Sequence, residues 1–460
     1  MSNTFFPFVG AFVWISILLI TGVFLRSKIS FLQHKLIPSA LIGGIVGFIL
    51  MNAGLIGMPT AEGWKVIPPK AFGVLVYHLF AFGFVGIGLM EQAKSTKKEG
   101  TSWLRSGALW MALIYCMVYA LQALTGKGIF ELYNYVTNGD IFTGLGYLVG
   151  AGFAQNPGAG QAMGLIWESQ YGIMGAGSVG LAFGAMGFLM AIAIGIPFVN
   201  RGVRNGWATG KDAGKLPKAL LVGLMDKGES KPCANATTHA SNVDSLGFHL
   251  GVMFVLYILG YLFALVWTVE MPKGISGLGF GLLYAWGMIA AIIVKKAMQA
   301  MDKFHIIDSD TVCRISGTTV DFMICAVFMG ITVGDIQAIF VPFLSTVVVA
   351  GIFSYFAVVW FARRMPEYGF ERGLATFGCY TGTVASGLLL LRIVDPKFKS
   401  PAVIELAIMN VFILPIVQLI YINLPFVPSE GSIMLPVFVG YLIAMPIAIF
   451  ALGFVRKRVW

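Results

Sequence analysis

The chain has 460 residues, of which 58% are hydrophobic and only 11% are charged. A soluble globular domain has about 25% charged residues, so this composition excludes an ordinary soluble protein. The net charge of +10 is divided among short groups that flank apolar stretches, which is typical of membrane orientation signals and not of a nucleic-acid-binding surface.

Apolar runs of about 20 residues, the length that crosses a bilayer, recur along the whole chain. The first run lacks a basic leader and a small-residue cleavage site, so we expect it to be retained as a span. A polar segment, 201–245, separates the fifth span from the sixth. The predicted spans are 5–25, 37–57, 71–91, 104–125, 171–198, 247–269, 274–295, 315–334, 337–361, 401–423 and 432–455.

Two further apolar segments, about 141–168 and about 370–391, are interrupted near their middle. The first contains GFAQNPGAGQAMG (152–164), where Pro157 and four glycines would break a helix. Irregular backbone survives at membrane depth only where it is buried in protein or lines a wet cavity. Each segment is therefore predicted to be a re-entrant hairpin that enters and leaves the membrane on one side.

The lysines and arginines favour this topology. With the N-terminus outside and both hairpins re-entrant, all but four of the 31 basic residues lie in inside loops. If each interrupted segment crossed the membrane once, the basic segment 201–231 would lie outside. We therefore expect an outside N-terminus, a cytoplasmic C-terminus and a cytoplasmic linker at 201–245. The four residues left outside are Lys65, Lys70, Lys127 and Lys273.

The same topology predicts an internal repeat. Residues 1–200 form five spans with a hairpin before the fifth, and residues 246–424 form five more with a hairpin before the tenth. An odd number of spans inverts the second unit relative to the first. Residues 425–460 add one C-terminal helix. The predicted fold class is an all-α polytopic membrane protein with two inverted five-span repeats and one extra helix, about 11 spans in all.

Four motifs are spread over the two halves: IPSALIGG (37–44), YHLFAFGFVGIGL (77–89), GFAQNPGAGQAMG (152–164) and FGCYTGTVASG (377–387). In these motifs, and over the chain to about residue 424, the sequence resembles the bacterial sodium/glutamate symporter family. The resemblance implies elevator-type transport of glutamate coupled to sodium, a homodimer, and the bacterial inner membrane. The first hairpin departs from the family, with QNPGAG (155–160) where the family has roughly GGHGTG, and this leaves the substrate's identity open.

Free amides, hydroxyls and backbone N–H groups at two facing hairpin tips are predicted to bind an anionic substrate. Arg392 could meet a substrate carboxylate, or it could anchor the chain at the inside surface. The candidate substrate-binding residues are Gln155, Asn156, Gly158, Gly160, Gln161, Thr381, Gly382, Thr383, Ser386 and Arg392.

Asp321 is the deepest acidic residue, about two turns inside the span 315–334. A charge at that depth costs roughly 2.5–3.5 kcal/mol on insertion scales, so we expect it to have a role. It could bind sodium, carry a proton or partner a buried donor. Sodium prefers oxygen ligands, and the candidate ligands are Asp321, Asn156, Thr381, Thr383, Glu405 and Asn410.

No nucleotide-binding loop, HExxH motif or plausible Ser/His/Asp set is present, so we expect neither an enzyme nor an ATP-driven pump. Sodium, as the coupling ion, is the one cofactor expected, and nucleic acid is not an expected partner. The leading hypothesis is sodium-coupled symport of a small anionic amino acid or carboxylate across the bilayer. The alternatives are a proton-coupled exchanger or symporter of an organic anion, and a membrane binding or signalling module that does not transport.

Overall fold

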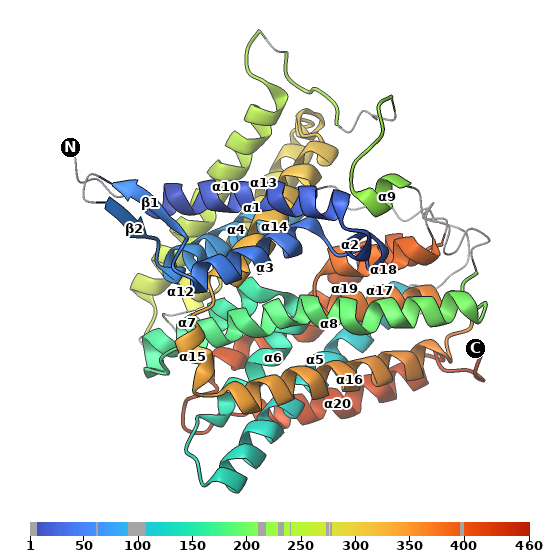
Figure 1. Cartoon of the computed structure of the whole chain (residues 1–460). Coiled ribbons are helices and arrows are strands. Elements are labelled where there is room, and N and C mark those ends of the chain that lie inside the picture. The colour runs from blue at the N-terminus through green and yellow to red at the C-terminus, as the bar shows by residue number, and fades with distance from the viewer. Residues whose placement is uncertain are drawn as a thin grey trace. The chain divides into compact units, whose positions relative to one another are not determined.

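The computed structural model describes residues 7–60, 63–90, 107–209, 218–228, 234–239, 241–272, 276, 278–395 and 400–460 (Figure 1). Among them, eight helices are long and apolar enough to cross a membrane, and a ninth is added if the bent helix α19 is counted as one span. The chain is therefore a helical, multi-pass membrane protein. The described residues form two compact units. Each unit combines segments from the first and the second half of the sequence.

Unit 1 takes its residues from 1–30, 38–92 and 222–331. Helices α4 and α14 of this unit pack against each other. Helix α4 also packs on α13, and α14 also packs on α3, so each contacts a further helix from the other half of the chain. Its elements are α1 (Pro7–Lys28), α3 (Ser39–Asn52), β1 (Gly57–Thr60), β2 (Gly63–Val66), α4 (Pro69–Leu89), α10 (Ser245–Glu270), α12 (Leu278–Gly281), α13 (Leu283–Ala300), η4 (Phe304–Ile306) and α14 (Ser309–Met329).

Small residues allow the helices of unit 1 to pack closely. A Cβ atom on Gly43 of α3 would collide with the backbone of Leu18 in α1. A Cβ atom on Gly260 of α10 would lie 2.5 Å from the Cα of Gly287 in α13. Helices in membranes associate through such contacts because lipid tails solvate apolar side chains as well as a protein core does.

Unit 2 takes its residues from 31–37, 93–221 and 332–460. Helix α5 is its centre: most of its side chains are buried, and it packs on α16, α19 and α20. Its elements are α2 (Ser30–His34, which begins in unit 1), α5 (Gly107–Thr137), η2 (Thr143–Tyr147), α6 (Leu148–Gly150), the π-helical turn η3 (Ala151–Gln155), α7 (Pro157–Tyr171), α8 (Ala176–Arg204), α9 (Lys218–Val222), α15 (Val333–Gln337), α16 (Phe340–Ala362), α17 (Gly369–Thr381), α18 (Val384–Val394), α19 (Ala402–Asn423), η5 (Leu424–Phe426) and α20 (Met434–Ala451).

Several predicted boundaries differ from the structure. Helix α5 continues to Thr137, twelve residues beyond the predicted end at 125, and within this extension Lys127 and Glu131, one turn apart, form an ion pair. The predicted span 37–57 ends at Asn52, and a short antiparallel ribbon, β1–β2, follows it, so the expected all-α class missed a small β element. The predicted span 274–295 is divided at Leu282 into α12 and α13.

Candidate functional site

The first interrupted segment is a helical hairpin and not one continuous helix. The turn η3 ends at Gln155, Asn156 is extended with φ 167° and ψ 173°, and α7 begins at Pro157. Proline is favoured at the first position of a helix because it has no N–H group to satisfy there. The Asn156 Oδ1 atom accepts a hydrogen bond from the Ala159 N–H at 3.1 Å, as a helix-capping residue does.

The two arms of this hairpin lie side by side, since a Cβ atom on Gly160 would be 3.2 Å from the Cα of Gly152. The hairpin tip is therefore at Asn156. We call residues 143–171 the first hairpin.

The second interrupted segment is also a hairpin. Helix α17 ends at Thr381, and α18 begins at Val384 after the non-helical residues Gly382 and Thr383. Its arms pack closely, because a Cβ atom on Gly378 would lie 2.8 Å from the Cα of Gly387. We call residues 369–394 the second hairpin.

The tips of the two hairpins meet on one face of α8. A Cβ atom on Gly184 would collide with the Cα of Pro157 in the first hairpin. A Cβ atom on Gly187, one turn further along α8, would collide with the Thr381 carbonyl oxygen and lie 3.1 Å from the Phe153 ring. The breaks that the sequence places 226 residues apart (156 and 382) are therefore neighbours in unit 2.

Polar side chains at the tips fall into two groups. Asn156 caps α7, and the Thr381 hydroxyl donates to the Phe377 carbonyl oxygen at 2.8 Å, so both have partners in their own hairpin. The Gln161 Oε1 and Thr383 Oγ1 atoms are buried without a hydrogen-bond partner among the described residues. Buried polar atoms are nearly always satisfied in native proteins. These two oxygens are therefore the groups most available to a bound ion, substrate or water.

Two of the glycines that were predicted to bind substrate pack closely against neighbouring backbone or side chains. A Cβ atom on Gly160 would lie 2.5 Å from the Gly180 carbonyl oxygen of α8. A Cβ atom on Gly382 would lie 2.7 Å from the Ser386 Oγ atom, across the turn of the second hairpin. Gly158 is buried in the first turn of α7. Arg392 is an exposed residue in the last turn of α18.

A buried tyrosine network beside the tips was missed by the sequence reasoning. The hydroxyls of Tyr115 (α5) and Tyr421 (α19) are 3.3 Å apart, and Tyr421 also hydrogen-bonds with the Gln155 side chain. Tyr380 of the second hairpin donates its hydroxyl hydrogen to the Met111 carbonyl oxygen of α5. Side chains from both hairpins are thus hydrogen-bonded to α5 or α19.

Gln122 of α5 extends this network. Its Nε2 atom donates to the Ser354 Oγ atom at 2.9 Å and to the Tyr380 carbonyl oxygen at 3.0 Å, and Gln122 has no exposed surface. The sequence signal for these hydrogen bonds is a glutamine within the apolar run 104–125, because a buried amide needs hydrogen-bond partners.

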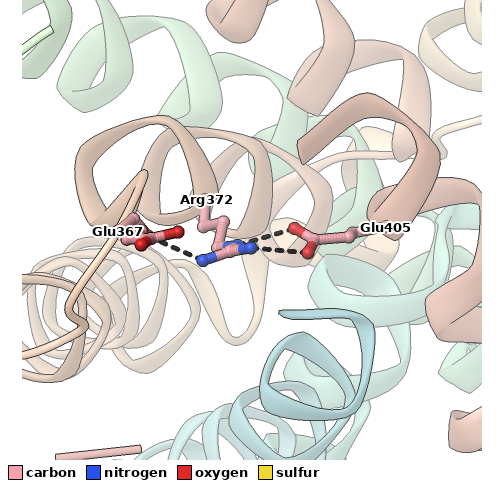
Figure 2. A network of polar contacts seen from close by, with 3 residues as sticks. All are labelled: Glu367, Arg372 and Glu405. Atoms are coloured by element: carbon pink, nitrogen blue, oxygen red, sulfur yellow. Dashed lines mark hydrogen bonds and ion pairs between the residues drawn. The ribbon is translucent and has the colours of Figure 1, made fainter. Parts of the chain in front are cut away.

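Glu405, a predicted sodium ligand, is paired with an arginine (Figure 2). The Arg372 Nε atom donates to Glu405 Oε2 at 2.6 Å, and Nη2 donates to Oε1 at 2.5 Å. Arg372 Nη1 donates to the Glu367 carbonyl oxygen at 2.6 Å. Both carboxylate oxygens of Glu405 are thus engaged by a cation, and its role as an ion ligand stays a prediction.

The other predicted ion ligands belong to different elements of the two units. Asp321 lies in α14 of unit 1, whereas both hairpins belong to unit 2. Its side chain is exposed and has no hydrogen bond or ion pair with any described residue. Asn410 is exposed where α19 bends by 49° between Ala402–Asn410 and Pro415–Phe426, and the proline accounts for the bend. Within the described ranges, no three His, Cys, Asp or Glu side chains converge on a point.

Comparison of the sequence with models of known protein families and with curated proteins finds no match. The resemblance to the sodium/glutamate symporters therefore rests on the four motifs, and what it implies enters below as a proposal.

Proposed function

We propose that the chain is a secondary active transporter that carries a small anionic amino acid or carboxylate in symport with sodium, with glutamate as the first substrate to test. The observation that supports this most is the meeting of two hairpin tips on α8. Backbone groups freed at broken helices bind ions at membrane depth without charged side chains. Helices α7 and α18 begin at these breaks, so the positive ends of two helix dipoles lie near the hairpin tips. Two such helix ends favour the binding of an anion.

Helix contacts support the proposed inverted repeats. Helix α1 packs on α3 as α10 packs on α13, and α3 packs on α14 as α13 packs on α4. In each half of the chain, the first three long helices belong to unit 1. The next helix, the hairpin and the helix after it belong to unit 2. When two repeats are related by a pseudo-two-fold axis, each contact between a helix of one repeat and a helix of the other has an equivalent contact with the two repeats interchanged. In the elevator-type mechanism that the resemblance implies, unit 2 would carry the substrate and α20 would be an addition to the repeat.

Sodium or a proton could be the coupling ion. Asp321 is a membrane-depth carboxylate with no partner in the described part of the chain, which suits either a sodium ligand or a proton carrier. Sodium-dependent uptake that is insensitive to a pH gradient supports symport with sodium. Uptake that follows the pH gradient in the absence of sodium supports the proton-coupled alternative.

Flux in liposomes tests the proposal directly. The purified full-length chain is reconstituted, and uptake of labelled glutamate, aspartate and a dicarboxylate is measured with an inward sodium gradient, an inward proton gradient or neither. We expect gradient-driven accumulation of at least one of these anions. Protein that binds an anion but gives no flux under any gradient would contradict transport and favour a binding or signalling module.

A further inference from the structure

Three basic segments that are far apart in the sequence meet in unit 2. They are the end of α8 with Arg201, the end of α16 with Arg363 and Arg364, and the segment 456–460 after α20. The Arg456 N–H donates to the Arg364 carbonyl oxygen at 2.9 Å, and the Val459 N–H donates to the Arg363 carbonyl oxygen at 2.8 Å. Backbone hydrogen bonds therefore hold the final segment along the end of α16.

Tryptophan rings surround one of these arginines. The rings of Trp207 and Trp460 are 4.7 Å apart and tilted by 33°. The Arg363 guanidinium carbon lies 5.4 Å from the Trp207 ring centre and 5.1 Å from that of Trp460, within cation–π range. The Arg364 guanidinium carbon lies 3.9 Å from the centre of the Trp360 ring. Arginine and tryptophan side by side at the ends of membrane helices are typical of the headgroup region.

The positive charges of this group are met by main-chain oxygens and not by acidic side chains, since Arg458 Nε donates to the Trp460 oxygen and Arg364 Nη1 to the Trp360 carbonyl oxygen, both at 2.8 Å. Burial and the neighbouring guanidinium groups of Arg458, Arg201 and Arg364 lower the pKa of Arg363 below its ordinary value. None of these four arginines forms an ion pair with an Asp or Glu side chain in the part of the chain that the structure describes. The carboxylates of α17 and α19 have other partners, since Glu371 accepts from Thr209 and Glu405 from Arg372.

Two buried donors beside the cluster also lack acceptors. The Arg363 Nε and Trp460 Nε1 atoms have no hydrogen-bond partner among the described residues. Buried donors are nearly always satisfied in native proteins, so these two mark the cluster as incomplete without a further acceptor. An anion with several oxygens would complement the positive charge of the cluster.

We propose that Arg201, Arg363, Arg364 and Arg458, with Trp207 and Trp460, form a binding site for the phosphate group of an anionic phospholipid. A lipid is favoured over a free anion because the cluster lies where the membrane helices α8 and α16 end and where the chain emerges from α20. Basic pockets between membrane helices bind anionic headgroups in this way. The proposal does not depend on what the chain transports.

The site also adjoins the second hairpin. The Phe370 ring, in the first turn of α17, lies 5.3 Å from the Trp460 ring and 5.8 Å from the Trp207 ring. A lipid that holds these tryptophans in place would stabilise the base of the hairpin.

Native mass spectrometry of the full-length protein in neutral detergent tests the proposal, with phosphatidylglycerol, cardiolipin and phosphatidylcholine as probes. We expect the two anionic lipids to bind and phosphatidylcholine not to. Arg201 and Arg458 are exposed, so the double variant R201Q/R458Q should fold. Each cation near an anionic headgroup contributes on the order of fivefold to binding, so this variant should bind roughly 30-fold more weakly.

Two controls make the test specific. K303Q/R314Q removes two exposed cations from unit 1 and should leave lipid binding unchanged. R201K/R458K retains the charge and should retain most of the binding. Equal binding of phosphatidylcholine, an unchanged affinity in R201Q/R458Q, or an equal loss in K303Q/R314Q would overturn the proposal. If inorganic phosphate occupies the site as tightly as the lipids do, the ligand is a free anion and the lipid assignment is wrong.

Discussion

Arg372 and Glu405 join the second hairpin to α19 through two parallel hydrogen bonds of 2.6 and 2.5 Å, and their side chains are only 10% and 14% exposed. The planar guanidinium group matches both carboxylate oxygens at once, which makes such pairs strong and directional. Because α17 begins only a few residues before Arg372, the pair fixes the base of the hairpin and leaves its tip to the contacts on α8.

The first prediction concerns this ion pair. Arg372→Gln should destabilise the protein by about 3–5 kcal/mol, because it leaves Glu405 buried without a cation. Thermal unfolding in detergent measures the effect. The double variant R372M/E405L, which removes both charges, should be closer to the wild type than either single variant. If Arg372→Gln unfolds at the wild-type temperature, the pair contributes nothing and the hairpin base is held in another way.

The second prediction concerns the tips. Gly187→Ala introduces a methyl group that collides with the Thr381 carbonyl oxygen, so it should separate the second hairpin from α8 at a cost of about 1–3 kcal/mol. Uptake in liposomes should fall together with stability. The matched control is Gly128→Ala in α5, where no atom lies within 4 Å of the added Cβ. That variant should keep wild-type uptake and be as stable or slightly more stable.

The third prediction concerns pH. Asp308 precedes α14, and its carboxylate accepts hydrogen bonds from Thr311 and Asn235. Burial works against its charged form, but these hydrogen bonds outweigh burial and lower the pKa of Asp308 from 3.8 to about 2. A lowered pKa in the folded state adds stability that is full above 3.8 and is lost as the pH falls through about 2.

Asp308→Ala should therefore cost about 0.5–2 kcal/mol at neutral pH, the usual value of a helix cap. The difference from the wild type should shrink once the pH falls below 3.8. Asp310→Ala, in the same first turn but exposed, is the control and should cost less. A difference that stays constant down to the acid limit of the measurement would show that the charge of Asp308 is not what stabilises α14.

The fourth prediction concerns coupling. Asp321→Asn keeps the shape of the side chain and removes its charge, so it should weaken the dependence of uptake on sodium without unfolding the protein. Sodium and substrate should raise each other's affinity by the same factor in the wild type, and this factor should fall in the variant. If Asp321→Asn leaves the sodium dependence of uptake intact, Asp321 is not the sodium ligand. Backbone carbonyl oxygens at the hairpin tips are then the next candidate ligands, because Glu405 is already paired with Arg372.

The fifth prediction concerns topology. Single cysteines at Arg364 and Arg456, whose backbones are hydrogen-bonded to each other, should react with an impermeant reagent only from the cytoplasmic side. A cysteine at Lys65, in the ribbon β1–β2, should react only from outside. Labelling of Arg364→Cys from outside would contradict the orientation that the charge distribution predicts. Two further cations predicted on this face, Lys397 and Lys399, lie outside the described residues.

The sequence by itself determined the class of the protein and the places where its helices break. Composition and runs of apolar residues depend only on the bilayer's thickness and dielectric, so they identify membrane helices without any tertiary contact. The break at Asn156–Pro157 was equally readable, because proline cannot continue a helix and asparagine caps one. The break at Gly382 was readable from its small and polar neighbours.

Only the tertiary structure decided which residues meet. Glu405 and Asp321 look alike in the sequence, as acids within apolar runs, yet one is paired with Arg372 and the other has no partner among the described residues. Tyr115 and Tyr421 are separated by 306 residues and nothing in the local pattern joins them. Local propensity is set by a few neighbouring residues along the chain, whereas ion pairs and buried hydrogen bonds depend on packing between helices that are distant in sequence.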